Sequence, residues 1–95
     1  MTIGKKLREL REQKGLLLRQ VAAEFEVDTA YISKMEQGKK NIKRDFIVKF
    51  AKLYGADENE LLTIWLANQV YDTLINEKVA NNVLKTVSEL INKKK

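Results

Sequence analysis

Residues 18–37, with the sequence LRQVAAEFEVDTAYISKMEQ, contain two short helical patterns with almost no chain between them. In each half, apolar residues recur at the spacing of one helix face. These residues are Val21, Ala22, Phe25, Ile32 and Met35. Because so short a connection brings the two helices into contact, the stretch predicts a helix, a tight turn and a second helix.

The composition extends this prediction to the whole chain. The 95 residues are enough for one small domain with a single core. There is no proline and there are four glycines, whereas a sandwich or barrel would need many turn residues. We therefore predict an all-α fold, with helices over residues 2–14, 18–25, 29–37, 45–54, 57–75 and 77–92.

Residues with helix-ending and helix-starting preferences support these bounds. Glycine is expected to end three of the helices, at Gly15, Gly38 and Gly55. Asp28 and Asn76 are suitable N-caps, and Asp57 with Glu60 matches the capping box D-x-x-E. Lysines at the end of the last helix, Lys93, Lys94 and Lys95, complement the negative end of its dipole.

The chain is basic, and part of its positive charge is clustered. Lys and Arg number 18 against 13 Asp and Glu, which gives a formal net charge of +5. Such a chain favours nucleic acid or an anionic membrane surface, although solvated charge for solubility is the alternative. The concentration of basic residues between 34 and 44 favours nucleic acid.

The absence of two residue types argues against several kinds of chemistry. Without cysteine there is neither a disulfide nor a thiolate zinc site, and without histidine the commonest general base and metal ligand are missing. The acidic residues are scattered over helix surfaces and caps, so we expect no enzymatic activity, metal or cofactor. No apolar run is long enough to span a bilayer and the N-terminus lacks a signal-peptide core, so we expect a cytoplasmic protein without membrane contact.

Specific motifs then resemble a known family. The segments are KKLRELREQKGL, QVAAEFEVDTAYISKMEQGKK and FIVKFAKLYGADENELL, within residues 3–62. They resemble the Cro/phage-repressor (XRE) type of helix-turn-helix domain, and the combination of ISKMEQGKK with AKLYGADENELL is the most specific part. The resemblance implies a five-helix repressor-like DNA-binding domain, assigned to residues 1–66, and double-stranded DNA as the partner.

The resemblance also implies roles for individual residues. The second helix of the motif would enter the major groove. The residues that would face base edges are Thr29, Ala30, Ser33 and Lys34, with the lysine donating to guanine O6 or N7. The residues that would contact the DNA backbone are Tyr31, Gln37, Lys39, Lys40, Asn41, Lys43 and Arg44. Arg11 and Glu36 occupy the positions of a structural ion pair.

Three positions depart from the family pattern. Leu17 and Leu18 stand where a Ser or Thr and a Gln usually open the second helix, which puts a phosphate contact in doubt. Glu26 stands at a turn position that is often glycine, so it must adopt a strained conformation or a different turn. The proline usual before the fourth helix is also missing.

Residues 67–95 extend beyond the minimal domain and carry an amphipathic helix. Its apolar stripe can fold back onto its own domain, pair with a second copy, or bind another protein or a membrane surface. We favour a homodimer, because domains of this family usually bind two half-sites about one helical turn apart. The residues expected at the interface are Trp65, Tyr71, Leu74, Val79, Val83, Leu84, Val87, Leu90 and Ile91, although core packing also explains the first three.

The sequence therefore predicts a sequence-specific transcriptional regulator that binds a near-palindromic operator as a homodimer. Repression by promoter occlusion is favoured over activation. The alternative is an antitoxin-like interaction module, in which the C-terminal helices bind a protein partner and DNA binding is autoregulatory.

Overall fold

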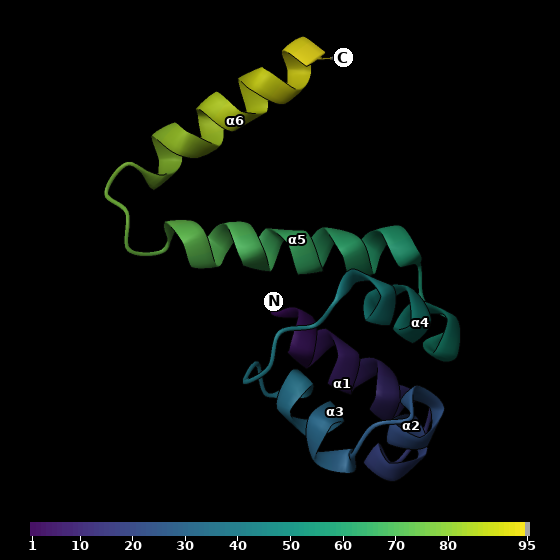
Figure 1. Ribbon diagram of the computed structural model, residues 1–95. Coiled ribbons are helices and arrows are strands. Elements are labelled where there is room, and N and C mark those ends of the chain that lie inside the picture. The colour runs from purple at the N-terminus through teal and green to yellow at the C-terminus, as the bar shows by residue number, and fades with distance from the viewer. Residues whose placement is uncertain (95) are drawn as a thin grey trace.

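The computed structural model describes residues 1–94, and Lys95, one of the three expected C-terminal lysines, lies outside this range. The described residues form six helices and no strand, which confirms the all-α class (Figure 1). The helices are α1 (Ile3–Gln13), α2 (Leu18–Phe25), α3 (Thr29–Glu36), α4 (Arg44–Tyr54), α5 (Glu58–Leu74) and α6 (Ala80–Lys94).

Most helix ends follow the local signals in the sequence. Gly15, Gly38 and Gly55 all have a positive φ, which glycine adopts without strain. Asp57 accepts a hydrogen bond from the backbone N–H of Glu60 at 3.1 Å, as expected for an N-cap. The Glu60 carboxylate lies 3.4 Å from the amine of Lys6, so this acidic residue also ties α5 to α1.

The prediction for the start of the last helix was wrong. The helix α6 begins at Ala80, and Asn76 is not its N-cap. The backbone N–H of Glu77 donates to the carbonyl of Leu74 at 2.9 Å, so Asn76 lies inside the turn that follows α5. Asparagine is favoured both at helix N-caps and in turns, so the residue type alone does not tell which of the two it occupies.

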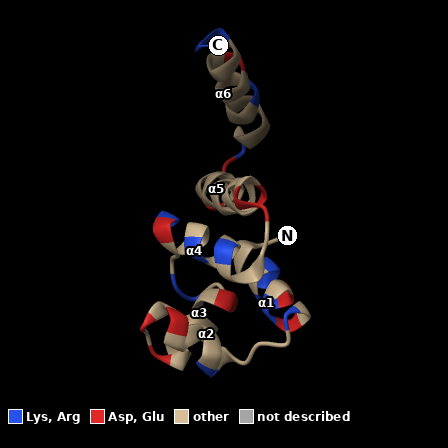
Figure 2. Cartoon of the chain, turned by 90° about the vertical axis from the view of Figure 1, so that its right-hand side faces the viewer, with Lys and Arg blue, Asp and Glu red and all other residues tan. Residues whose placement is uncertain are grey.

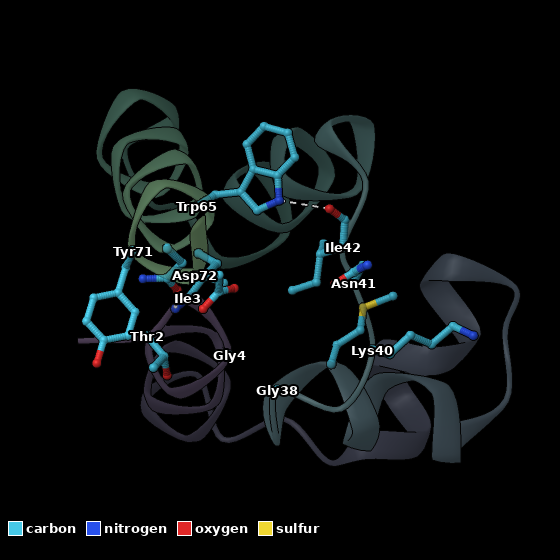
Figure 3. A pocket seen from close by; sticks show the side chains of 12 residues that line it. Thr2, Ile3, Gly4, Gly38, Lys40, Asn41, Ile42, Trp65, Tyr71 and Asp72 are labelled. Atoms are coloured by element: carbon cyan, nitrogen blue, oxygen red, sulfur yellow. Dashed lines mark hydrogen bonds between the residues drawn. The ribbon is translucent and has the colours of Figure 1, made fainter. Parts of the chain in front are cut away.

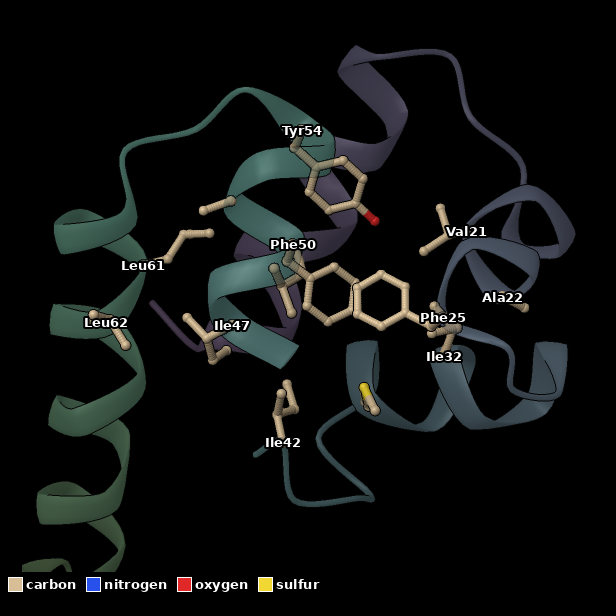
Figure 4. Packing of buried hydrophobic residues seen from close by; sticks show 13 residues of the cluster. Val21, Ala22, Phe25, Ile32, Ile42, Ile47, Phe50, Tyr54, Leu61 and Leu62 are labelled. Carbon is tan, nitrogen blue, oxygen red and sulfur yellow. The ribbon is translucent and has the colours of Figure 1, made fainter. Parts of the chain in front are cut away.

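The core lies between α1, α2, α3, α4 and the first turns of α5 (Figure 4). Its largest fully buried side chains are Leu7, Val21, Ile32, Met35, Ile47, Phe50 and Leu61. An aromatic group links α2 to α4, with ring centroids 4.3 Å apart for Phe25 and Phe50 and 5.6 Å apart for Phe50 and Tyr54. Burial raises the pKa of the Tyr54 hydroxyl above its usual value, because ionisation would place a charge in this apolar setting.

The second half of the chain leaves this core. The helix α5 packs on the core through Leu61 and Leu62 and continues without a break past residue 66, where we had placed the end of the DNA-binding domain. After a turn, α6 runs away from the rest of the molecule and has no buried residue (Figure 1). Within residues 1–94, no helix is long and apolar enough to cross a membrane.

Candidate nucleic-acid interface

One face of α3 is buried and the opposite face is open to solvent. Ile32 and Met35 are fully buried against the core, while Thr29, Ala30 and Lys34 are exposed. Ser33 is half-buried and its hydroxyl accepts a hydrogen bond from the Gln37 amide at 3.0 Å. The residues that we expect to face bases therefore share the outer side of a helix whose inner side is fixed.

The turn between α2 and α3 brings the two helices close together. Ala22 is buried at their contact, and its carbonyl accepts from the backbone N–H of Val27 at 3.1 Å. Glu26 adopts the left-handed conformation with φ 55° and ψ 42°. This conformation is strained for a residue that has a Cβ atom. The Glu26 side chain is exposed, so the conformation disrupts no side-chain packing. The turn geometry of the motif is thus kept without the usual glycine.

A largely buried ion pair fixes the end of α3. Arg11 Nε donates to Glu36 Oε2 at 2.8 Å, and a second guanidinium nitrogen donates to Glu36 Oε1 at 3.1 Å. The remaining terminal nitrogen donates to the carbonyl of Leu16 at 3.0 Å. The hydrogen bonds to Glu36 raise the pKa of Arg11, so this residue remains protonated. One guanidinium therefore joins α1, the loop before α2 and the last residue of α3.

Gly4 is a second anchor of α3 that was not predicted from the sequence. A Cβ atom at this position would lie 2.5 Å from the carbonyl oxygen of Met35 and 2.6 Å from that of Glu36. The first turn of α1 thus approaches the backbone at the end of α3 more closely than any other residue type would allow. A glycine in the first turn of an amphipathic helix was the only signal in the sequence.

Replacing Gly4 with alanine is expected to lower the unfolding free energy by about 1–3 kcal/mol, because overpacking outweighs the better helix propensity of alanine. Chemical denaturation measures this change. Gly15→Ala is the matched control, because a Cβ there meets no atom within 4 Å and only the positive φ of 68° is penalised. A Gly4→Ala protein as stable as the parent would show that α1 and α3 can separate at little cost.

The entry to α2 lacks polar side chains at the positions where the family usually has them. Leu17 occupies the N-cap and gives no side-chain cap. Its backbone N–H instead donates to the Gln20 side chain at 2.8 Å, so this glutamine caps the helix from within its first turn. Leu18, which stands where the family usually has a phosphate-anchoring glutamine, is half-buried against the core, while Leu17 beside it is 49% exposed.

The loop after α3 carries the basic cluster. Lys39, Lys40, Asn41, Lys43 and Arg44 are all exposed. The Lys40 amine lies 4.4 Å from the centre of the Tyr31 ring, and this half-buried ring lies 6.1 Å from that of Phe46. The aromatic contacts hold one lysine of the loop beside α3. This loop thus places a group of exposed basic residues next to the end of α3.

The helix α5 holds this loop through a hydrogen bond to its backbone. Trp65 Nε1 donates to the carbonyl of Ile42 at 2.8 Å, and the Ile42 side chain is buried below it (Figure 3). Asn68 accepts from the backbone N–H of Ile3 at 2.6 Å and so also holds the start of α1. Since Trp65 packs on its own domain, it is not among the exposed apolar residues that we assign below to a dimer surface.

A small pocket of about 240 Å³ lies between α5, the start of α1 and the loop (Figure 3).

Both signs of charge are spread over α1–α4, whereas α6 is mostly uncharged along its length (Figure 2). Among residues 1–94, the structure holds no group of three or more carboxylates that is placed to hold a metal ion.

Comparisons with known proteins agree with this geometry. A family model described as a helix-turn-helix domain matches residues 2–63. The HTH-type transcriptional regulator DdrOP3 of Deinococcus deserti is 32% identical over 62 residues, which are 65% of this chain and 48% of that protein. The chain thus matches about half the length of this relative, and no solved structure matches the chain significantly. The family model and the arrangement of α1–α5 show that the chain belongs to the helix-turn-helix domain family of the Cro/phage-repressor (XRE) type.

Proposed function

We propose that this protein is a transcriptional regulator that binds a near-palindromic DNA operator as a homodimer and represses by occluding the promoter. In each half-site, α3 enters the major groove. The observation that carries the proposal is the position of α3, which is fixed by Arg11 and Gly4 on its inner side and open at Thr29, Ala30 and Lys34 on its outer side. A rigid helix with a free outer face is what groove recognition requires.

Sequence specificity comes from the outer face of α3 in this proposal. The Lys34 amine donates to guanine O6 or N7, and the Ala30 methyl packs against a thymine methyl. Thr29 contacts a base or a phosphate from the first turn. The hydrogen bond between Gln37 and Ser33 orients both side chains at the end of this face.

Affinity comes mainly from phosphates. The basic loop supplies Lys39, Lys40 and Lys43 beside α3, and Arg44 follows as the first residue of α4. Each phosphate neutralised releases counterions, so binding weakens steeply with salt and positions the protein without selecting a sequence. With Leu17 and Leu18 at the entry to α2, the phosphate contacts move toward this loop.

The homodimer is supported by the exposed apolar residues of the second half of α5, of the turn after it and of α6. Its large members are Leu66, Val70, Tyr71, Ile75, Val79, Leu84, Val87, Leu90 and Ile91, each at least 43% exposed. Exposed apolar side chains gathered in one part of a protein often mark an interaction surface. A second copy covers it and places two α3 helices on successive major grooves.

Replacing Lys34 with alanine tests base recognition. On a site selected from random DNA by the parent protein, we expect a loss of about 1–3 kcal/mol in binding free energy, and much less on random DNA. Titrations of both DNAs at one salt concentration measure this difference. Lys52→Ala is a control, because Lys52 is exposed on α4, away from α3. Equal losses on the two DNAs would place Lys34 on a phosphate instead.

Replacing Trp65 with phenylalanine tests the anchoring of the basic loop. The change removes the donor to Ile42 but keeps an aromatic ring, and costs about 0.5–1.5 kcal/mol of stability. Because the loop contacts phosphates, we expect the affinity for selected and random DNA to fall by similar factors, unlike Lys34→Ala. Unchanged affinity for both would show that the loop needs no support from α5.

A further inference from the structure

The helix α5 presents apolar side chains on two opposite sides. Leu61 is fully buried in the core, and Val70, nine residues later, points to the other side at 100° per residue and is 46% exposed. Leu66 lies near Val70 on this outer side and is 45% exposed. A helix with apolar residues on both sides packs between two layers. In the described chain, only one of these layers is present.

The helix α6 carries an apolar stripe that is wider than a two-helix seam uses. In residues 84–90, three of seven positions are apolar, namely Leu84, Val87 and Leu90, and Ile91 follows. At 100° per residue, the stripe spans about 120° of the helix surface. A seam between two helices uses about two positions in seven, whereas a core-facing helix of a bundle or globular domain uses about three. The pattern therefore indicates a helix packed in a core, and α6 packs extensively on no other helix within residues 1–94.

The two helices diverge and leave an apolar cleft between them. The cleft has a volume of about 500 Å³ and is lined by Ala67, Val70 and Leu74 of α5 and by Ala80 and Leu84 of α6. Alanines on both walls allow the backbone of a third helix to come close. Because α6 itself forms one wall, it does not fill the cleft of its own chain.

The charges at the helix ends indicate the direction of the occupant. Helix α5 starts with the N-cap Asp57, Glu58 and Glu60, of which Glu60 already pairs with Lys6, and α6 ends with Lys93 and Lys94. A helix like α6 that packs antiparallel to α5 places its basic end over this acidic start. The rest of α6, whose charged residues are Lys85 and Glu89, then lies over the apolar outer side of α5 (Figure 2).

We propose that α6 of a second copy fills this cleft, antiparallel to α5, and that the exchange is reciprocal. The two α5 and two α6 helices then form a four-helix bundle, in which each α6 contacts both α5 and α6 of the partner. A second copy is the occupant that has both the wide stripe and the basic end, and two-fold symmetry buries both clefts at once. This inference rests on the homodimer of the proposed function and specifies how it forms.

Thiol cross-linking tests the exchange, because the chain has no native cysteine. One copy carries Val70→Cys, and a second copy with a longer tag carries Leu84→Cys, Val87→Cys or Ile91→Cys, so that the set samples the stripe. A short bifunctional maleimide is added to the mixed dimers. We expect a mixed cross-link for at least one of the three, at a yield at least tenfold above that of Val70→Cys mixed with Glu89→Cys. Glu89 lies on the far side of α6 from Val87, at about 160°.

An intramolecular control separates exchange from folding back. A single chain with Val70→Cys and Val87→Cys is mixed with excess parent protein, and we expect little cross-linking within the chain. An efficient intrachain cross-link would show that α6 packs on its own α5 and would overturn the inference.

Sedimentation of the same proteins distinguishes this inference from the proposed function. A dimer without any mixed cross-link would overturn the exchange and leave the homodimer standing. A monomer would overturn both. Val87→Asp supplies a second measurement, since it is expected to shift the sedimenting species to monomer while the thermal unfolding of the helix-turn-helix domain stays unchanged. A Val87→Asp protein that remains dimeric would also count against the bundle.

Discussion

Replacing Arg11 with methionine is expected to lower the unfolding free energy by about 3–5 kcal/mol, because it leaves a buried carboxylate without its partner. The Glu36 side chain is 5% exposed and accepts two hydrogen bonds from the guanidinium. Methionine keeps much of the packing of the aliphatic stem but supplies no donor. The carbonyl of Leu16 also loses its contact with this side chain.

Chemical denaturation of Arg11→Met measures the loss, and Arg8→Met is the matched control. Arg8 pairs with Glu12 at 3.1 Å, but their side chains are 63% and 57% exposed, so its removal is expected to cost less than about 1 kcal/mol. The double variant Arg11→Met with Glu36→Leu is expected to recover most of the stability, because no uncompensated charge remains. If Arg8→Met and Arg11→Met lower the unfolding free energy by similar amounts, burial of the Arg11–Glu36 pair contributes little to stability.

Ending the chain after Asn76 is expected to produce a folded monomer whose affinity for a two-half-site operator falls roughly 100-fold or more. The domain stays folded because its buried hydrophobic residues all lie between Leu7 and Leu62. The affinity falls because the second half-site is no longer bound by a linked copy. Sedimentation, thermal unfolding and DNA titration measure the three parts of this prediction.

Two results would contradict this prediction in different ways. A truncated protein that still sediments as a dimer would place the interface in residues 1–76. A full-length protein that is monomeric alone but purifies with a stoichiometric protein partner would favour the antitoxin-like alternative. The matched control is a single half-site, for which the full-length and truncated proteins are expected to have similar affinities, because both present the same α3.

The sequence predicted the first five helices closely because their signals are local. Apolar residues at helical spacing, glycines at the ends and the Asp57 cap act within a few residues, so the positions of α1–α5 follow from short segments. The bounds of α2 agree with the prediction at both ends. The start of α6 was misplaced because Asn76 suits a cap and a turn equally.

The contacts that position α3 were less accessible to sequence reasoning. The positions of Arg11 and Glu36 came from the family resemblance, and not from spacing. Gly4 and Trp65 were not assigned to the support of α3 and the loop, because their partners are backbone carbonyls. A carbonyl is present at every residue, so its position in the sequence carries no information about which side chain approaches it.

By itself, the sequence determined that this protein is helical, where its first five helices lie and which side chains point outward from α3. These properties depend on periodicity and capping, which are short-range. Only the tertiary structure decided that Gly4 holds the end of α3, that α5 holds the basic loop, and that α6 leaves its own core. Those outcomes depend on distances between residues far apart in the chain, which are set by how the helices pack together.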